Sequence, residues 1–260
     1  MPEGVAALSA AWPFISDPWF YAVAVPAVLL MGLGKSGFLS GFGALATPLL
    51  SLVVPVPQAA AIMLPLLLVM DATGLQQLWR ERDPAPVRLL LPWGLLGVLA
   101  GTLLFRALTA QAVAGLVGAL TLAFLAQRLL FPPRVGAPPA SPWVGRACAA
   151  VSGFTSFVAH AGGPPISAYA LPLRLEPRVL AGSLAVFFAA VNLAKWIPYA
   201  VLGLIDLRNM ATALVLLPVA PLGVWAGVWL VRRVSPTLFY RIAYAGMALT
   251  GFKLLWDSLG

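Results

Sequence analysis

Ten apolar runs, separated by short charged or proline-rich segments, constrain this chain more than any other feature. Most of them approach or exceed the roughly 20 residues that a helix needs to cross a bilayer. The runs cover residues 18–34, 42–54, 58–79, 86–105, 111–131, 143–160, 162–173, 179–204, 208–231 and 236–256. Only 9% of the residues are charged and 61% are hydrophobic, whereas soluble domains carry about 25% charged residues. The sequence therefore predicts an all-α polytopic membrane protein with eight to ten transmembrane segments.

Two of the runs, 42–54 and 162–173, are too short to span a bilayer upright. Each follows a glycine-rich break, at residues 32–37 and at residues 160–165. Each is therefore either a short tilted span or one arm of a re-entrant pair, and the sequence leaves both readings open.

The short runs occupy matching places in an internal repeat. Three groups of residues recur in the same order with a slowly changing offset, which is typical of a duplicated unit. They are Gly37, Phe38 and Pro48 with Gly153, Phe154 and Pro164 at offset 116; Pro57 with Pro177 near offset 120; and Pro92, Gly97, Gly101 and Arg106 with Pro218, Gly223, Gly227 and Arg232 at offset 126.

The repeat divides the chain into two membrane halves. An N-terminal segment, 1–17, precedes the first half, 18–131; a proline-rich linker, 132–142, leads to the second half, 143–260. Each half has five crossings if the short runs cross, or three if they are re-entrant. Either number is odd, so the second half is expected to be inverted, as in many secondary transporters with glycine- or proline-interrupted segments.

Loop charge predicts the orientation. With the 80–88 loop in the cytoplasm, ten arginines lie inside, and only Arg106, Arg208 and Lys253 lie at the other face. This distribution satisfies the positive-inside rule and places both termini outside. Residues 1–17 lack Lys and Arg, so no cleaved signal peptide is expected. The expected location is the cell inner (plasma) membrane.

Several functional classes are excluded. The net charge of +8 would suit a nucleic-acid partner in a soluble protein, but here the arginines are spread between apolar runs. The single cysteine, Cys148, excludes internal disulfides, and one cysteine with one histidine makes a zinc site implausible. There is no Walker A, H-E-x-x-H or Gly-x-Ser-x-Gly sequence. No metal or cofactor is expected.

The paired glycine-rich breaks are the best candidates for a binding site. Interrupted backbone at membrane depth survives where it lines a cavity or meets a ligand, and helix N-termini favour anions. Nearby hydroxyls, amides and cations complete a site suited to a small oxyanion. The candidate substrate-binding residues are Lys35, Ser36, Ser40, Gly41, Gly43, Thr47, Pro48, Ser152, Ser156, His160, Gly162, Gly163, Pro164, Asn192 and Lys195. The alternative is close helix packing through small residues.

Two ionisable residues lie deep in apolar runs, where charge is costly. Asp71 in run 58–79 matches Asn192 in run 179–204 at offset 121, and Lys195 follows three residues later. Asp71 and Lys195 either form a structural pair, or Lys195 attracts the anion while Asp71 relays a proton. Lys35 is either an anion ligand or a membrane-interface anchor.

His160 is the only histidine of the chain. It is either a structural hydrogen-bond donor or a second candidate for proton relay, because histidine titrates near neutral pH. With Ser152 or Ser156 it is also the sole candidate set for an intramembrane enzyme.

These motifs resemble the sulfite exporter TauE/SafE-like membrane transporters over roughly residues 20–256. The matching features are the Gly37–Gly43 stretch running to Pro48, Gly153-Phe154 with residues 160–164, Ala181-Gly182-Ser183, Gly203-Leu204-Ile205-Asp206, and Gly94, Gly97 and Gly101. The resemblance implies two related halves and the transport of sulfur-containing anions such as sulfite and organosulfonates.

The sequence thus predicts a secondary transporter, not an enzyme, that moves a small anion by alternating access. Sulfite or an organosulfonate is the expected substrate. The lipid bilayer surrounds the protein, and a proton is the candidate coupling ion. Another carboxylate or inorganic ion, an intramembrane Ser/His enzyme and a non-transporting scaffold are the alternatives. The oligomeric state, a homodimer included, stays open.

Overall fold

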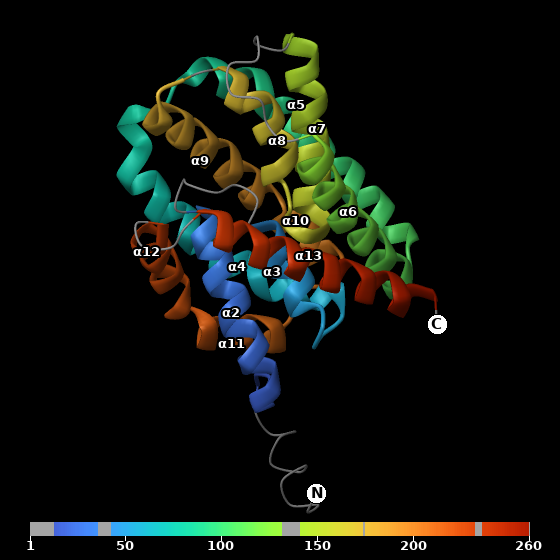
Figure 1. Ribbon diagram of the computed structural model, residues 1–260. Helices are drawn as coiled ribbons and strands as arrows, with labels where there is room; N and C mark the ends of the chain where they lie inside the picture. Colours follow the sequence, from blue (N-terminus) through green and yellow to red (C-terminus); the bar gives the residue numbers. More distant parts are fainter. Residues whose placement is uncertain (1–12, 36–42, 132–140, 174, 232–235, 260) are drawn as a thin grey trace, which may run out of the picture.

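The computed structural model describes residues 13–35, 43–131, 141–173, 175–231 and 236–259, and within these ranges the regular structure is entirely helical (Figure 1). The first half contains α2 (Pro18–Lys35), α3 (Gly43–Leu50), α4 (Val56–Leu78), the 3₁₀ turn η1 (Trp79–Glu81), α5 (Pro84–Ala107) and α6 (Ala110–Leu130). The second contains α7 (Pro142–Ala159), α8 (Gly163–Ala170), the 3₁₀ turn η2 (Leu171–Leu173), α9 (Pro177–Ala194), α10 (Trp196–Val201), α11 (Leu207–Leu216), α12 (Val219–Val231) and α13 (Pro236–Leu259).

Local sequence signals explain where several helices begin. Asp83, Thr109 and Asp206 precede α5, α6 and α11, and each side chain accepts a hydrogen bond from a backbone N–H of the first turn. Such caps satisfy donors that have no partner within the helix. Proline stands at the first position of α5, α7 and α9, where its missing N–H costs nothing.

Two long apolar runs are broken by proline. Run 179–204 divides into α9 and α10 at Lys195, because Pro198 cannot donate to the carbonyl of Ala194. Run 208–231 divides into α11 and α12, which meet at 46° across Leu217 and Pro218. The first break places a lysine at a helix end in the protein interior.

The two short runs form helices of only eight residues, α3 and α8. At 1.5 Å per residue each is about 12 Å long, well short of a bilayer core of about 30 Å. Helix α3 packs against α2, and α8 packs against α7. The α7–α8 connection contains only residues 160–162, and it turns the chain back beside α7 (Figure 1).

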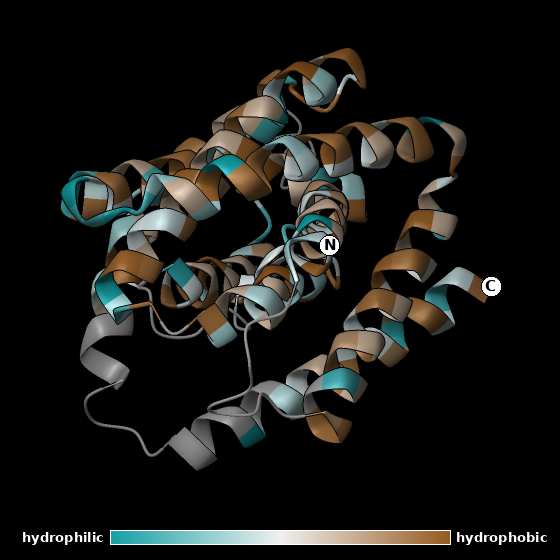
Figure 2. Ribbon diagram, turned by 90° about the horizontal axis from the view of Figure 1, so that it is seen from above, coloured by the Kyte–Doolittle hydropathy of each residue, from teal (hydrophilic) through white to brown (hydrophobic). Residues whose placement is uncertain are grey.

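The described part of the chain has five helices that are long and apolar enough to cross a membrane, or six if α11 and α12 form one bent span. Large apolar side chains face outward, among them Leu99 and Leu103 of α5 and Trp225 of α12, which are 54%, 60% and 71% exposed. In Figure 2 hydrophobic residues run along most of the helices. The expectation of an all-α, multi-pass membrane protein is confirmed.

Helices from the two halves approach to backbone contact at glycines. A Cβ atom on Gly97 of α5 would lie 2.0 Å from the carbonyl oxygen of Ala150 on α7, and one on Gly153 would lie 1.9 Å from that of Gly94. A Cβ on Gly32 of α2 would lie 2.5 Å from the backbone of α12. Small residues allow such crossings in membranes, and they hold the helices around the interior cavity.

Candidate functional site

A cavity of about 490 Å³ lies between the two halves of the chain. Its walls come from α2, α3 and α4 of the first half and from α7, α8 and α9 of the second. Most of the surface is apolar, and the polar side chains that reach it are Lys35, Asp71, Ser156, His160, Ser167 and Asn192. A mainly apolar pocket with a few convergent polar groups is the usual form of a small-molecule site.

The first glycine-rich break opens onto this cavity. Helix α2 ends at Lys35, and α3 begins at Gly43; both residues line the wall. Thr47 is buried one turn into α3, and its hydroxyl has no hydrogen-bond partner among the described residues. Pro48 is buried beside it, outside the cavity lining. The candidates Ser36, Ser40 and Gly41 lie outside the described residues.

The second break is a tight turn whose carbonyls are satisfied from within α7. His160 ends α7 in the left-handed conformation, with φ of 53°, and its N–H donates to Ser156. The Ser152 hydroxyl donates to the Gly162 carbonyl at 2.7 Å, and the Thr155 hydroxyl donates to Ala161. These bonds fix the turn, and they direct the start of α8 toward the cavity, where Gly163 lines the wall.

The two short helices differ in the donors that they offer. The first turn of α3, residues 43–46, carries a backbone N–H at every position. In α8, Gly163 is followed by Pro164 and Pro165, which have no N–H. The first turn of α3 therefore has more backbone N–H groups than the first turn of α8, and such groups favour an anion at a helix N-terminus.

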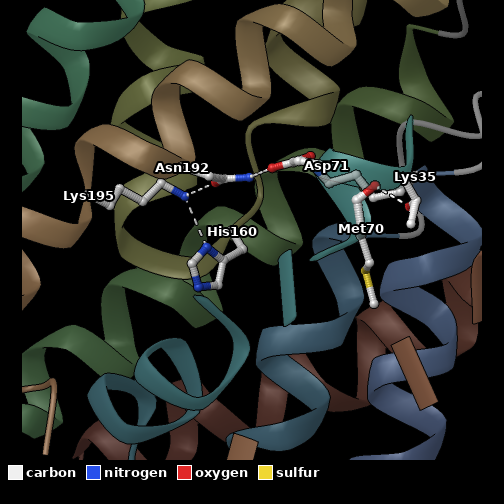
Figure 3. A network of polar contacts seen from close by, with 7 residues as sticks. Lys35, Met70, Asp71, His160, Asn192 and Lys195 are labelled. Atoms are coloured by element: carbon white, nitrogen blue, oxygen red, sulfur yellow. Dashed lines mark hydrogen bonds and ion pairs between the residues drawn. The ribbon is translucent and has the colours of Figure 1, made fainter. Parts of the chain in front are cut away.

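A chain of polar contacts links the first half to the second (Figure 3). Lys35 pairs with one carboxylate oxygen of Asp71, and the amide nitrogen of Asn192 donates to the other at 2.5 Å. Asp71 and Asn192 are 4% and 2% exposed. The direct ion-pair partner of Asp71 is thus Lys35, and Asn192 stands between Asp71 and Lys195.

The chain of contacts continues behind the cavity wall. Lys195 is fully buried and does not line the cavity. Its ammonium nitrogen lies 2.7 Å from the Asn192 amide oxygen and 3.0 Å from Nδ1 of His160. Nε2 of His160 lies 2.9 Å from the Ala60 carbonyl oxygen, which can only accept. Nε2 therefore carries a hydrogen, and Nδ1 is the acceptor for Lys195.

The charges of this network do not cancel when both lysines are protonated. Lys35 and Lys195 then contribute two positive charges and Asp71 one negative charge, while His160 is neutral. No other acidic side chain of the described residues contacts the network. Buried charge without a counter-charge is unfavourable, so with both lysines protonated the network carries one positive charge that an anion in the cavity would balance.

The structure brings together part of the predicted set. Seven predicted residues line the cavity: Lys35, Gly43, Asp71, Ser156, His160, Gly163 and Asn192. Six others do not line it: Thr47, Pro48, Ser152, Gly162, Pro164 and Lys195. Sequence reasoning missed Ser167, whose position one helical turn after Gly163 was the available signal, and Phe188, whose ring centroid lies 5.0 Å from the Lys35 nitrogen.

The hydroxyl of Ser152, near His160, is engaged elsewhere. The Ser152 hydroxyl donates to Gly162, and both ring nitrogens of His160 contact other groups, the Ala60 carbonyl and Lys195. A serine nucleophile needs hydrogen-bond contact with its base. Among the described residues, the ring nitrogens of His160 contact the Ala60 carbonyl and Lys195 and not a serine hydroxyl.

Comparison with known proteins identifies a family for this chain. Residues 22–254 match the family model described as Sulfite exporter TauE/SafE. No curated protein and no solved structure matches the chain. Because the match covers almost the whole sequence, and the structure contains membrane-length helices around a mainly apolar cavity with a few polar side chains, this chain belongs to the sulfite exporter TauE/SafE family of membrane transporters.

Proposed function

We propose that this protein is a secondary transporter of a small organic anion, with an organosulfonate favoured over bare sulfite. The observation that carries the proposal is the composition of the polar network at the cavity, which contains two lysines and one aspartate. A single charge at the bilayer centre costs about 2.5–3.5 kcal/mol on insertion scales. When both lysines are protonated, a bound anion removes that cost by supplying the missing negative charge.

The size and lining of the cavity favour an anion with an organic part. A volume of about 490 Å³ is many times that of a four-atom oxyanion. Away from the polar side chains, the wall is formed by apolar residues such as Leu78, Leu180 and Leu184. An anionic head at Lys35 and the α3 N-terminus, with a carbon chain along these residues, would use both parts of the surface.

Alternating access between inverted halves is supported by the way the helices pair. Helix α5 of the first half packs on α7 of the second. In the repeat, α5 corresponds to the α11–α12 segment and α7 corresponds to α2, and α12 packs on α2 in the same way. Helix α6 packs on its own counterpart, α13. Asp71 and Asn192, matched at offset 121, are hydrogen bonded to each other. Contacts between equivalent residues are expected beside a two-fold axis.

We further propose that α2–α3 and α7–α8 are re-entrant hairpins and that each half crosses the membrane three times. With cytoplasmic loops at 80–88 and 132–142, this arrangement puts both termini outside the cell inner membrane. A reporter that is active only in the cytoplasm should then be silent when fused after Gly260. Activity of that fusion, with a positive control fused in the 132–142 linker, would contradict the orientation.

Uptake into proteoliposomes tests the transport function. The purified protein should accumulate or exchange labelled organosulfonates faster than protein-free vesicles, with saturation and with competition by unlabelled anion. A short-chain carboxylate of matched length and sulfite serve as comparison substrates. Equal fluxes in loaded and empty vesicles for all of these anions would overturn the proposal.

A further inference from the structure

We propose that His160 and Lys195 together hold the single proton that accompanies the anion through the protein. The inference rests on the proposed anion transport and adds the identity of the coupling-proton site. Its basis is the contact between Nδ1 of His160 and the Lys195 amine, 3.0 Å apart in a fully buried position (Figure 3).

The geometry allows this pair one excess proton and excludes two. Nε2 of His160 holds its hydrogen toward the Ala60 carbonyl, so Nδ1 faces Lys195. If the amine is an ammonium, Nδ1 must be bare to accept its hydrogen. If Nδ1 is protonated, the amine must be neutral to accept in return. One proton therefore lies between the two nitrogens, because two would put N–H groups head to head.

The pair is also stable without that proton. A neutral lysine amine has two hydrogens, and the structure offers two acceptors, Oδ1 of Asn192 and Nδ1 of His160. The third hydrogen of the ammonium has no partner among the described residues. Loss of the proton therefore breaks no hydrogen bond, which is the property required of a buried site that is loaded and unloaded in each cycle.

The charged and titratable groups around Lys195 support one charge change at this pair. Asp71 of α4 is already neutralised by Lys35 of α2 and is separated from Lys195 by Asn192. Tyr199 of α10 donates its hydroxyl to the Phe157 carbonyl. The basic residues of α5, Arg88 and Arg106, lie exposed near its two ends. Glu81 of η1 pairs with Arg178 at the far end of α9.

The resulting cycle balances charge. The empty protein has a neutral His160–Lys195 pair and a neutral Lys35–Asp71 pair. A proton from cavity water adds to the Lys195 nitrogen lone pair as the anion binds, so the loaded wall plus anion is again neutral. Release of the anion returns the proton to water. His160 and Asn192, which line the cavity, separate Lys195 from that water by one layer of side chains.

Proton uptake on anion binding tests the inference in the unaltered protein. Binding of an organosulfonate, measured by calorimetry in buffers of different ionisation enthalpy, should take up close to one proton per anion above the titration range of the pair. Affinity should fall about tenfold per pH unit there, because one proton is linked to one anion. Anion binding without proton uptake and without pH dependence, between pH 6 and 9, would overturn the inference while leaving the transport function intact. Absence of any binding would instead refute the proposed function.

Lys195→Arg tests whether the His160–Lys195 pair takes up the proton, because arginine stays charged and cannot gain one. The variant should bind anion with proton uptake reduced from one to near zero, and it should exchange labelled anion across vesicles while losing proton-driven accumulation. Lys253→Arg is the matched control, since Lys253 is 54% exposed and forms its ion pair with Asp257. If proton uptake persists in Lys195→Arg and disappears in Asp71→Asn, Asp71 carries the proton and the assignment is wrong.

Discussion

Replacement of Asp71 by asparagine isolates the contribution of the buried ion pair. The change keeps the shape of the side chain but removes the counter-charge of Lys35, and it leaves Asn192 facing an amide. Loss of one partner from a buried pair costs about 3–5 kcal/mol. Lys35 is 18% exposed, so water screens part of its charge. We therefore expect the lower end of that range, about 3 kcal/mol, in the free energy of unfolding.

A double-mutant cycle separates the pair from its surroundings. Lys35→Met alone should cost less than Asp71→Asn, because the carboxylate keeps its bond from Asn192. The combined variant should be more stable than the sum of the single changes predicts, with a coupling of about 1–3 kcal/mol. The assay is unfolding by SDS in mixed micelles, followed by circular dichroism.

The exposed pair Lys253–Asp257 provides the control cycle, since its side chains are 54% and 41% exposed. A surface pair of this kind contributes at most about 0.5 kcal/mol. If the cycle at Lys35 and Asp71 gives additive effects, within about 0.5 kcal/mol, the two residues do not form a stabilising pair. The charge balance proposed for the cavity would then be wrong.

Two further substitutions test the helix contacts and the second break. Gly97→Ala should destabilise the protein by about 1–3 kcal/mol, because its methyl group would overlap the Ala150 carbonyl. Gly74→Ala should be neutral or stabilising by up to about 1 kcal/mol, because an added Cβ there meets no neighbouring group within 4 Å. Equal unfolding free energies for the two variants would contradict the backbone contact at Gly97. Ser152→Ala should lower the free energy of unfolding by about 1–3 kcal/mol, because it leaves the buried Gly162 carbonyl without its hydroxyl donor. An unchanged unfolding midpoint would show that this hydrogen bond does not stabilise the turn.

The helical membrane fold could be predicted from the sequence because lipid imposes a strong and local requirement. A span needs a long apolar run whatever its neighbours are, so composition alone indicates the class. The eight-residue length of α3 and α8 was less accessible. Residues 42–54 read as one apolar run of 13, and only the structure shows that regular helix ends at Leu50.

The sequence indicates which residues belong to the polar network, but it does not indicate which of them contact each other. Asp71, Asn192, Lys195 and Lys35 are conspicuous because polar groups are rare in apolar runs. Which lysine contacts Asp71 depends on how α2, α4 and α9 cross, and that depends on glycine contacts between distant helices. Offset 121 did match Asp71 with Asn192, and the structure places these two in direct contact.

The prolines at the start of α8 make the two halves chemically unequal, although their helices pair reciprocally. A carrier with one donor-rich break and one donor-poor break holds its anion with different strength when it is open to one side than when it is open to the other. Thermodynamics forbids such asymmetry from setting the direction of net flux, which the ion gradients alone determine. It does set the concentration at which each side saturates. Under the proposed alternating access, the two halves would thus give a transporter whose kinetic constants differ across the membrane while its equilibrium does not.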